Sequence, residues 1–219
     1  MPLRDHFNPP LSQRRDWKGA FNGWTNALAD QLNGDRLPKD FFAEPRIHVG
    51  GIPAAFLARN APPPVYTIPT VFPDSYEVQV INSDAGPRLV AAIELISPGN
   101  KDRPETRRAF VAKCASYLSL GISVIIVDVV TNRRSNLHDE LLDFLGQPTT
   151  GRLGEDVELY AAAYRPLMRE KRSEIDLWPV ALQLGATLPT LPLFPAVDLA
   201  IPVDFEDAYA EACERLRVS

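Results

Sequence analysis

The sequence predicts an α/β fold, and two observations carry this prediction. Residues 76–82 alternate as a strand does, and a turn-rich link at 83–87 leads into an apolar returning strand at 88–96, which together indicate a hairpin. A helical pattern follows, and then an almost wholly apolar, β-branched segment at 122–130, which is typical of a strand covered on both faces. The strand, helix and buried strand are most simply a right-handed βαβ unit.

An amphipathic helix is expected before the hairpin. Apolar residues recur there at three- and four-residue spacing over 15–33 and predict a stripe that packs on the sheet. They are Trp17, Phe21, Trp24, Leu28 and Leu32. Asn33–Gly34 is expected to end this helix. Strand signals between Phe41 and Ala58 are weaker, because prolines and glycines interrupt them.

The helix between the hairpin and the buried strand has recognisable ends. Asp102 is able to cap it, with Glu105 three residues on, and Gly121 is expected to stop it. Its apolar residues share one face, as expected of a helix that packs on a sheet. They are Phe110, Val111, Cys114, Tyr117 and Leu118.

The C-terminal third carries further elements. We expect a short helix at 136–145, a strand at 157–164 and another sheet segment at 178–188. The proline-rich run at 188–195 is predicted to cross the surface in an extended conformation, because proline fixes φ and has no N–H to donate. A last helix at 204–216 is expected to begin at Asp204.

Length and composition narrow the class of protein. The 219 residues suit a single domain, with a core at about 41–165, a helical extension at 1–40, and a proline-rich segment and helix at 166–219 packed on the core. A formal net charge of −5 disfavours non-specific nucleic-acid binding, and two widely separated cysteines support neither a disulfide framework nor a Cys-rich zinc site. Neither a membrane-spanning apolar stretch nor a hydrophobic signal core is present, so we expect a cytoplasmic protein without membrane contact.

Two acidic residues interrupt the apolar strands. Glu94 lies within IELISPGNK, and Asp128 lies in the next strand. An isolated buried carboxylate is costly, so each must be paired, hydrated or bound to a cation. If the strands are neighbours, the two carboxylates could approach each other and bind a hard cation such as Mg²⁺. The alternative is that each one caps a helix, pairs with an arginine or lies at a hydrated strand end.

Basic side chains follow both strands. Ser97–Arg103 and Thr131–Ser135 come after parallel strands, so they are expected at the same edge of the sheet, where α/β sites usually form. The basic residues there predict either an anion-attracting rim or a solvated helix face. They are Lys101, Arg103, Arg107, Arg108, Lys113, Arg133 and Arg134. Other chemistries lack a signal, since GxSxG, Walker, GxGxxG and HExxH motifs are absent from the sequence.

These motifs resemble an uncharacterised bacterial family, domain of unknown function 4058. The resemblance rests on IELISPGNK, on the helix with Lys113 and Tyr117, and on GISVIIVDVV, and it extends over nearly the whole chain. WKGAFNGWTNALADQLN matches the N-terminal part of that family, and YRPLMREKRSEIDLWPVALQLGATLPTLPLFP matches its C-terminal part.

The same order of motifs is distantly similar to Uma-type proteins, which have the PD-(D/E)XK restriction-endonuclease fold, a mixed sheet flanked by helices. In that fold an Asp and a Glu on adjacent strands bind Mg²⁺, and a Lys orients or activates the attacking water. By position, Glu94 is the motif Glu. Ile96 stands where the Lys is usually found, so Lys113 is the candidate replacement and Lys101 the weaker one.

The upstream Asp of the motif has no clear counterpart. The run after His48 is GGIPAAF, and Asp74 in FPDSYEV is an imperfect match, which leaves Asp74 or Asp128 as the second metal ligand. Two hypotheses follow. One is an Mg²⁺-dependent phosphodiesterase with a degraded active site. The other is a non-catalytic module of the same fold that binds a protein or nucleic-acid partner. The residues expected to contact phosphate or the partner are Ser97, Asn100, Arg103, Arg107 and Tyr117.

Overall fold

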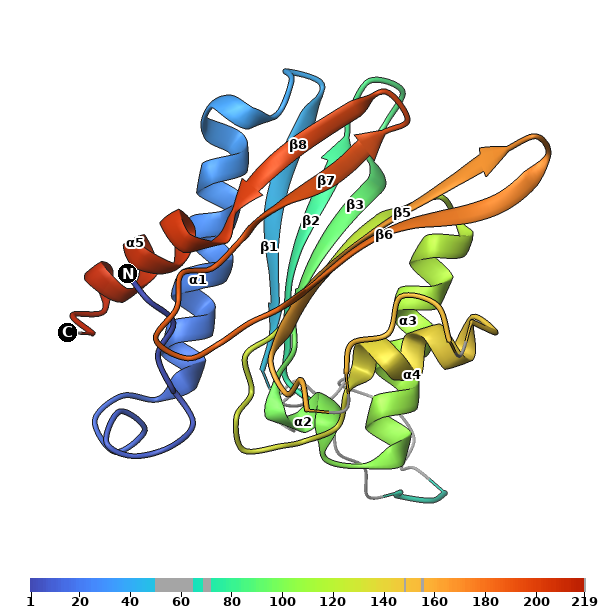
Figure 1. Cartoon of the computed structure of the whole chain (residues 1–219). Coiled ribbons are helices and arrows are strands. Elements are labelled where there is room, and N and C mark those ends of the chain that lie inside the picture. The colour runs from blue at the N-terminus through green and yellow to red at the C-terminus, as the bar shows by residue number, and fades with distance from the viewer. Residues whose placement is uncertain (50–64, 69–71, 148, 155, 219) are drawn as a thin grey trace.

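A computed structural model describes residues 1–49, 65–68, 72–147, 149–154 and 156–218 of the chain. Within these residues a six-stranded mixed sheet forms the centre, and its strands lie side by side in chain order (Figure 1). The third and fourth strands are parallel, and every other neighbouring pair is antiparallel. The strands are β1 Phe41–His48, β2 Ser75–Asn82, β3 Arg88–Leu95, β4 Ser123–Asp128, β5 Tyr160–Arg169 and β6 Arg172–Ala181.

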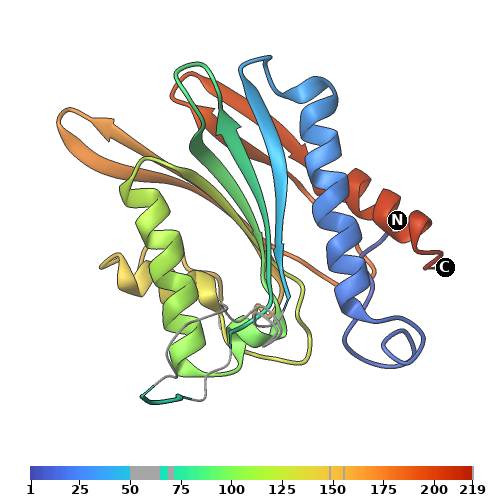
Figure 2. The ribbon, with the colours of Figure 1, turned by 180° about the vertical axis from the view of Figure 1, so that it is seen from behind.

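Helices cover the sheet on both sides (Figures 1 and 2). On one face lie α3 (Pro104–Ser119) and α4 (Leu137–Phe144). On the other lie α1 (Trp17–Gln31) and the two-stranded ribbon of β7 (Thr190–Ala196) and β8 (Leu199–Asp204), with α5 (Phe205–Arg215) packed against α1. A short helix, α2 (Pro98–Lys101), connects β3 to α3. The expected α/β fold with a mixed sheet flanked by helices is confirmed at this level.

Neighbouring residues of β2 show that the two layers lie on opposite faces. Tyr76 packs its ring against those of Trp17 and Phe21 of α1, at centroid distances of 5.7 and 5.3 Å. The next side chain, Glu77, reaches Tyr117 of α3 instead. Successive side chains of a strand point to opposite faces, so α1 and α3 sandwich the sheet.

The predicted N-terminal helix is confirmed in place and in its buried face. Asp16 caps α1 by accepting the N–H of Lys18, and the aromatic stripe is buried. The expected end at Asn33–Gly34 is wrong, because a π-helical turn over Leu32–Arg36 continues the coil. The Asn33 side chain exchanges two hydrogen bonds with the backbone of Ala43 in β1, which holds this turn against the sheet.

The structure confirms three predicted elements: the hairpin of β2 and β3, the wholly buried strand β4 and the helix α4.

The predicted N-cap of α3, Asp102, is wrong. Arg103 precedes the helix and donates its N–H to the Thr106 hydroxyl, at 3.3 Å. Asp102 instead ends α2 and forms an ion pair with Arg133, because the preceding Ser97–Lys101 segment coils into a helix of its own. That ion pair confirms that the segments after β3 and β4 lie at the same edge of the sheet.

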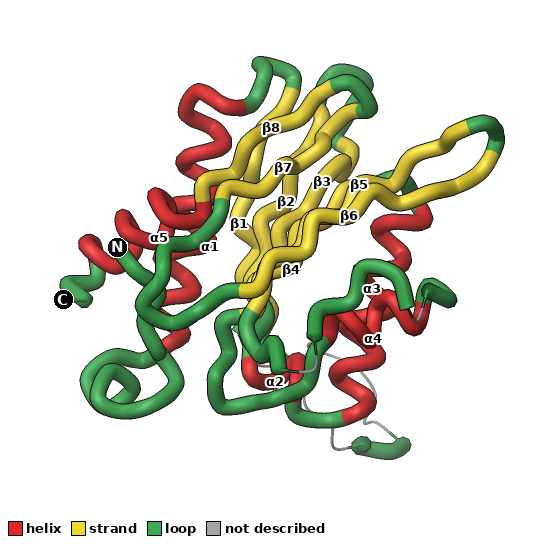
Figure 3. The backbone as a smooth tube through the Cα atoms, viewed as in Figure 1, coloured by secondary structure: helices red, strands yellow, loops and turns green. Residues whose placement is uncertain are grey.

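The C-terminal third differs most from expectation. β5 and β6 are longer than predicted and form a hairpin that projects beyond the other strands (Figure 3). The proline-rich run does not simply cross the surface, because β7 buries Leu191 and Leu193 and pairs with β8. A two-stranded ribbon tolerates prolines, since each strand has an edge that needs no N–H. Asp204 is the N-cap of the last helix, as predicted, and accepts the N–H of Asp207.

The weaker strand signal near residue 41 corresponds to β1, while residues 50–58 of the expected segment lie outside the described residues. Among the helices of the described residues, none has the length and apolar character that crossing a membrane requires.

Candidate functional site

Two carboxylates face each other across the central hairpin. The register of β2 and β3 places Glu77 directly opposite Glu94, on the face that α3 covers. A β-bulge sets this register by shifting the pairing by one residue at the Val80–Ile81 step, where Val90 is the extra residue on β3. Because a one-residue slip turns a side chain to the other face, the bulge decides that both carboxylates point the same way.

Helix α3 adds an amine and a phenol to the carboxylates. The Nζ atom of Lys113 lies 2.6 Å from Oε1 of Glu94 and 3.7 Å from Oε2 of Glu77. One turn later, the Tyr117 hydroxyl donates to Oε1 of Glu77 at 3.0 Å, and the Gln79 side-chain amide donates to the same oxygen at 3.0 Å. We call Glu77, Glu94, Lys113 and Tyr117 the dicarboxylate centre.

In the dicarboxylate centre, the two carboxylates on the sheet are buried, while the Lys113 side chain on α3 is partly exposed to solvent. The side chains of Glu94 and Glu77 are 2% and 7% exposed, whereas that of Lys113 is 32% exposed. Burial raises the pKa of Glu94 from 4.5 to about 7, although Lys113 lowers it, and Glu77 adds to the rise. Burial opposes the charge of Lys113, but the two carboxylates raise its pKa above the ordinary value. The Lys113 amine therefore stays charged while Glu94 titrates near neutral pH.

The Lys113 amine is the contact of the buried Glu94 oxygen. Oε1 of Glu94 is buried, and the charged amine of Lys113 contacts it at 2.6 Å. Two facing carboxylates offer the hard oxygen donors that Mg²⁺ takes in proteins, so the residues present fit such an ion once Lys113 moves aside. They provide only two carboxylates, and the described residues contain no cluster of three or more acidic, histidine or cysteine side chains suited to a metal.

The other two predicted metal ligands pair with lysines elsewhere. Asp74 precedes β2, and its Oδ2 atom lies 2.8 Å from Nζ of Lys18. Asp128, at the end of β4, lies 2.7 Å from Nζ of Lys101, and both side chains are fully buried. Burial raises the pKa of Asp128 to about 6, although Lys101 and the Val130 N–H lower it. The weaker candidate lysine is thus the counterion of Asp128, which fastens α2 to β4.

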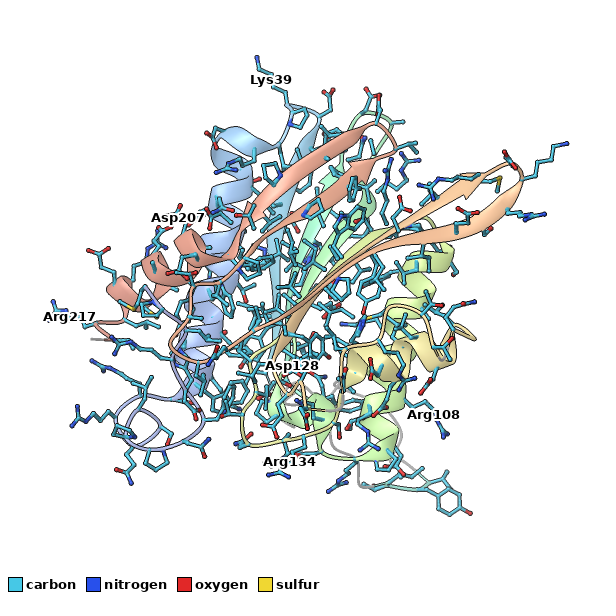
Figure 4. The ribbon with its side chains drawn as sticks, viewed as in Figure 1. Lys39, Arg108, Asp128, Arg134, Asp207 and Arg217 are labelled. Carbon is cyan, nitrogen blue, oxygen red and sulfur yellow. The ribbon has the colours of Figure 1, made fainter. Side chains whose placement is uncertain are left out.

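The predicted phosphate-contacting residues divide into internal and outward-facing groups. Ser97 donates its hydroxyl to the Asp74 carbonyl at 2.8 Å, and Asn100 accepts the Ser97 N–H at 2.8 Å, so both side chains build the bend into α2. Arg107 pairs with Glu140 of α4 at 2.8 Å. Arg103 is exposed, and Arg108 and Arg134 also extend into solvent along this side of the molecule (Figure 4).

Sequence reasoning found Glu94, Lys113 and Tyr117 but missed Glu77. Counting back from the five-residue link without a bulge places Glu77 opposite Ile93, with its side chain on the far face from Glu94. The signal that could have found it is the acidic residue in an otherwise buried strand, since an isolated buried carboxylate requires a partner.

Comparisons with protein-family models, with curated proteins and with solved structures found no match for this chain. The resemblance to the domain-of-unknown-function family and to Uma-type proteins therefore stays a prediction that rests on the motifs quoted above.

Proposed function

We propose that this chain is a nuclease-like protein that binds Mg²⁺ at Glu77 and Glu94 and hydrolyses phosphodiesters. The observation that carries the proposal is the pair of facing carboxylates with the Lys113 amine beside them. The PD-(D/E)XK resemblance implies two acidic residues on adjacent strands and one lysine. Glu77 supplies the acidic residue that neither Asp74 nor Asp128 supplies, and the mixed sheet flanked by helices agrees with the restriction-endonuclease-like fold that we propose here.

Each residue of the dicarboxylate centre has a distinct role in this proposal. Glu77 and Glu94 would hold the cation, which when bound supplies Lewis-acid stabilisation of a phosphate oxygen. Lys113 leaves its place between the carboxylates, which its partly exposed side chain permits, and orients the attacking water. Tyr117 holds Glu77 in position through its hydrogen bond. The exposed Arg103 is placed to contact the phosphate backbone.

A second function has an observation of its own in its favour. Lys113 already lies within ion-pair distance of both carboxylates, and a non-catalytic member of the fold would retain such a pair because removing one partner of a buried ion pair is destabilising. In that case the outward face of 97–108 would bind a protein or nucleic-acid partner. The expected cytoplasmic location stays a prediction under either function.

Cleavage assays separate the two functions. The wild-type chain, Glu77→Gln and Glu94→Gln are incubated with single- and double-stranded DNA in Mg²⁺ or Mn²⁺. Asp84→Asn, which alters an exposed carboxylate in the β2–β3 link, is the matched control. The proposal predicts cleavage by wild type and control and a loss of about 100-fold or more in both glutamine variants. Folded wild type without cleavage of either substrate would favour the binding module.

A further inference from the structure

Four arginines line an open cleft where the two ends of the chain meet. The cleft encloses about 690 Å³ and lies between the N-terminal segment, the loop before α1 and the end of α5. Both termini lie on this side of the molecule in each view (Figures 1 and 2). The arginines are Arg4, Arg14, Arg15 and Arg217. This cleft is separate from the dicarboxylate centre, and none of its lining residues belongs to that centre.

One acidic side chain offsets only part of the positive charge of the cleft. Among the described residues, no ion pair involves any of the four arginines. Asp5 is the carboxylate in the lining, and its oxygens already accept hydrogen bonds from Phe7, Asn8 and Thr131. The cleft is therefore cationic in a chain whose formal net charge is −5.

Arg217 occupies a backbone position that favours glycine. It follows α5 with φ of 52°, and its N–H donates to the Glu214 carbonyl while the next N–H, of Val218, donates to Cys213. These two bonds form a Schellman motif, whose left-handed residue is usually glycine because a Cβ atom is strained there. The motif places the Arg217 side chain at the cleft beside the three other arginines.

The remaining walls are held in place by backbone contacts. Leu3 exchanges backbone hydrogen bonds with the Gly185–Ala186 turn, and the Arg4 N–H donates to the Tyr209 hydroxyl at 3.1 Å. The N–H groups of Arg14 and Arg15 both donate to the Leu11 carbonyl. Anchored backbones lower the ordering cost that a ligand would meet on binding.

We propose that this cleft binds a small organic diphosphate. Guanidinium groups bind phosphate oxygens in pairs, and four of them match a ligand of three to four negative charges better than a single phosphate. The volume falls within the usual range for small-molecule sites. Pro9, Pro10 and Leu11 supply an apolar wall for the organic part of the ligand.

Calorimetric titration of the full chain with inorganic pyrophosphate tests this site. The variants are Arg14→Gln/Arg15→Gln and Arg217→Gly, and the control is Arg172→Gln, an exposed arginine at the far tip of the β5–β6 hairpin. We expect wild type and control to bind alike, each variant to bind about tenfold more weakly or worse, and added salt to weaken binding. Arg217→Gly also relieves the backbone strain, so its unfolding midpoint should not fall, which separates lost binding from lost folding.

Three results would overturn the proposal. One is the absence of pyrophosphate binding to the wild-type chain. Another is unchanged affinity in the Arg14→Gln/Arg15→Gln variant. The third is binding of a single-stranded oligonucleotide through the same arginines without any binding of pyrophosphate, which would assign the cleft to nucleic acid instead.

Discussion

Replacing Glu94 with glutamine is expected to remove a loss of stability that the wild-type chain suffers as pH rises from about 4.5 to about 7. The carboxyl group of Glu94 loses its proton near 4.5 in the unfolded chain and near 7 in the folded chain. The folded state therefore binds more protons within this window, so the free energy of unfolding falls as pH rises. This contribution is fully present below pH 4.5 and is lost as pH passes through about 7.

The size of this loss of stability follows from the pKa of Glu94 in the unfolded chain and in the folded chain. At about 1.4 kcal/mol for each pH unit between 4.5 and about 7, the loss approaches roughly 3 kcal/mol above neutral pH. Glutamine keeps the shape of the side chain but carries no proton to lose. The stability of Glu94→Gln should therefore vary less with pH than that of wild type. The two curves should agree below about pH 4.5, where Glu94 is protonated in both states, and separate as pH rises, so that the variant is the more stable above neutral pH.

Urea unfolding followed by circular dichroism, repeated from about pH 4 to about pH 8, measures both curves. Asp128→Asn is the matched control, because Asp128 has a raised pKa of about 6 in a different ion pair and its removal should alter only the lower part of the window. Parallel curves for wild type and Glu94→Gln would refute the reasoning, since they would mean that Glu94 has the same pKa in both states.

Three further changes test other contacts by urea unfolding. Lys101→Met should lower stability by about 3–5 kcal/mol near pH 8 and by less below pH 6, because Asp128 is left buried without its counterion; an unchanged midpoint would contradict the buried pair. Tyr117→Phe should cost about 1–2 kcal/mol through its lost hydrogen bond, and a neutral result would mean that the bond is not formed. Glu170→Asn with Lys171→Gly should add about 1 kcal/mol, since both residues have positive φ in the hairpin turn; destabilisation would contradict that turn.

The regular parts of the fold were predictable because pattern and burial agree there. β4 is apolar throughout and is buried throughout, and the aromatic stripe of α1 packs on the sheet as its spacing indicates. The β5–β6 hairpin was missed for an equally physical reason. Its turn has Glu170 and Lys171 at positive φ. Asparagine and glycine are the residues that usually predict such a turn, so the sequence does not indicate that the chain reverses direction here.

The candidate site was predictable only in part. Glu94 stands out as an acid in an apolar strand, and Lys113 lies on the next helix, so their proximity could be anticipated. The place of Glu77 depends on a β-bulge, and no residue in the hairpin is of a type that predicts a bulge there. The pairing of Asp128 with Lys101 depends on α2, a helix too short to show periodicity.

Mn²⁺ binding measured by calorimetry shows directly whether Glu77 and Glu94 together form a cation site. We expect one site in the wild-type chain and in Asp84→Asn, with binding lost in both Glu77→Gln and Glu94→Gln while circular dichroism shows that each variant is folded. Binding that persists in the two folded glutamine variants, or a folded wild-type chain that binds no Mn²⁺, would contradict it.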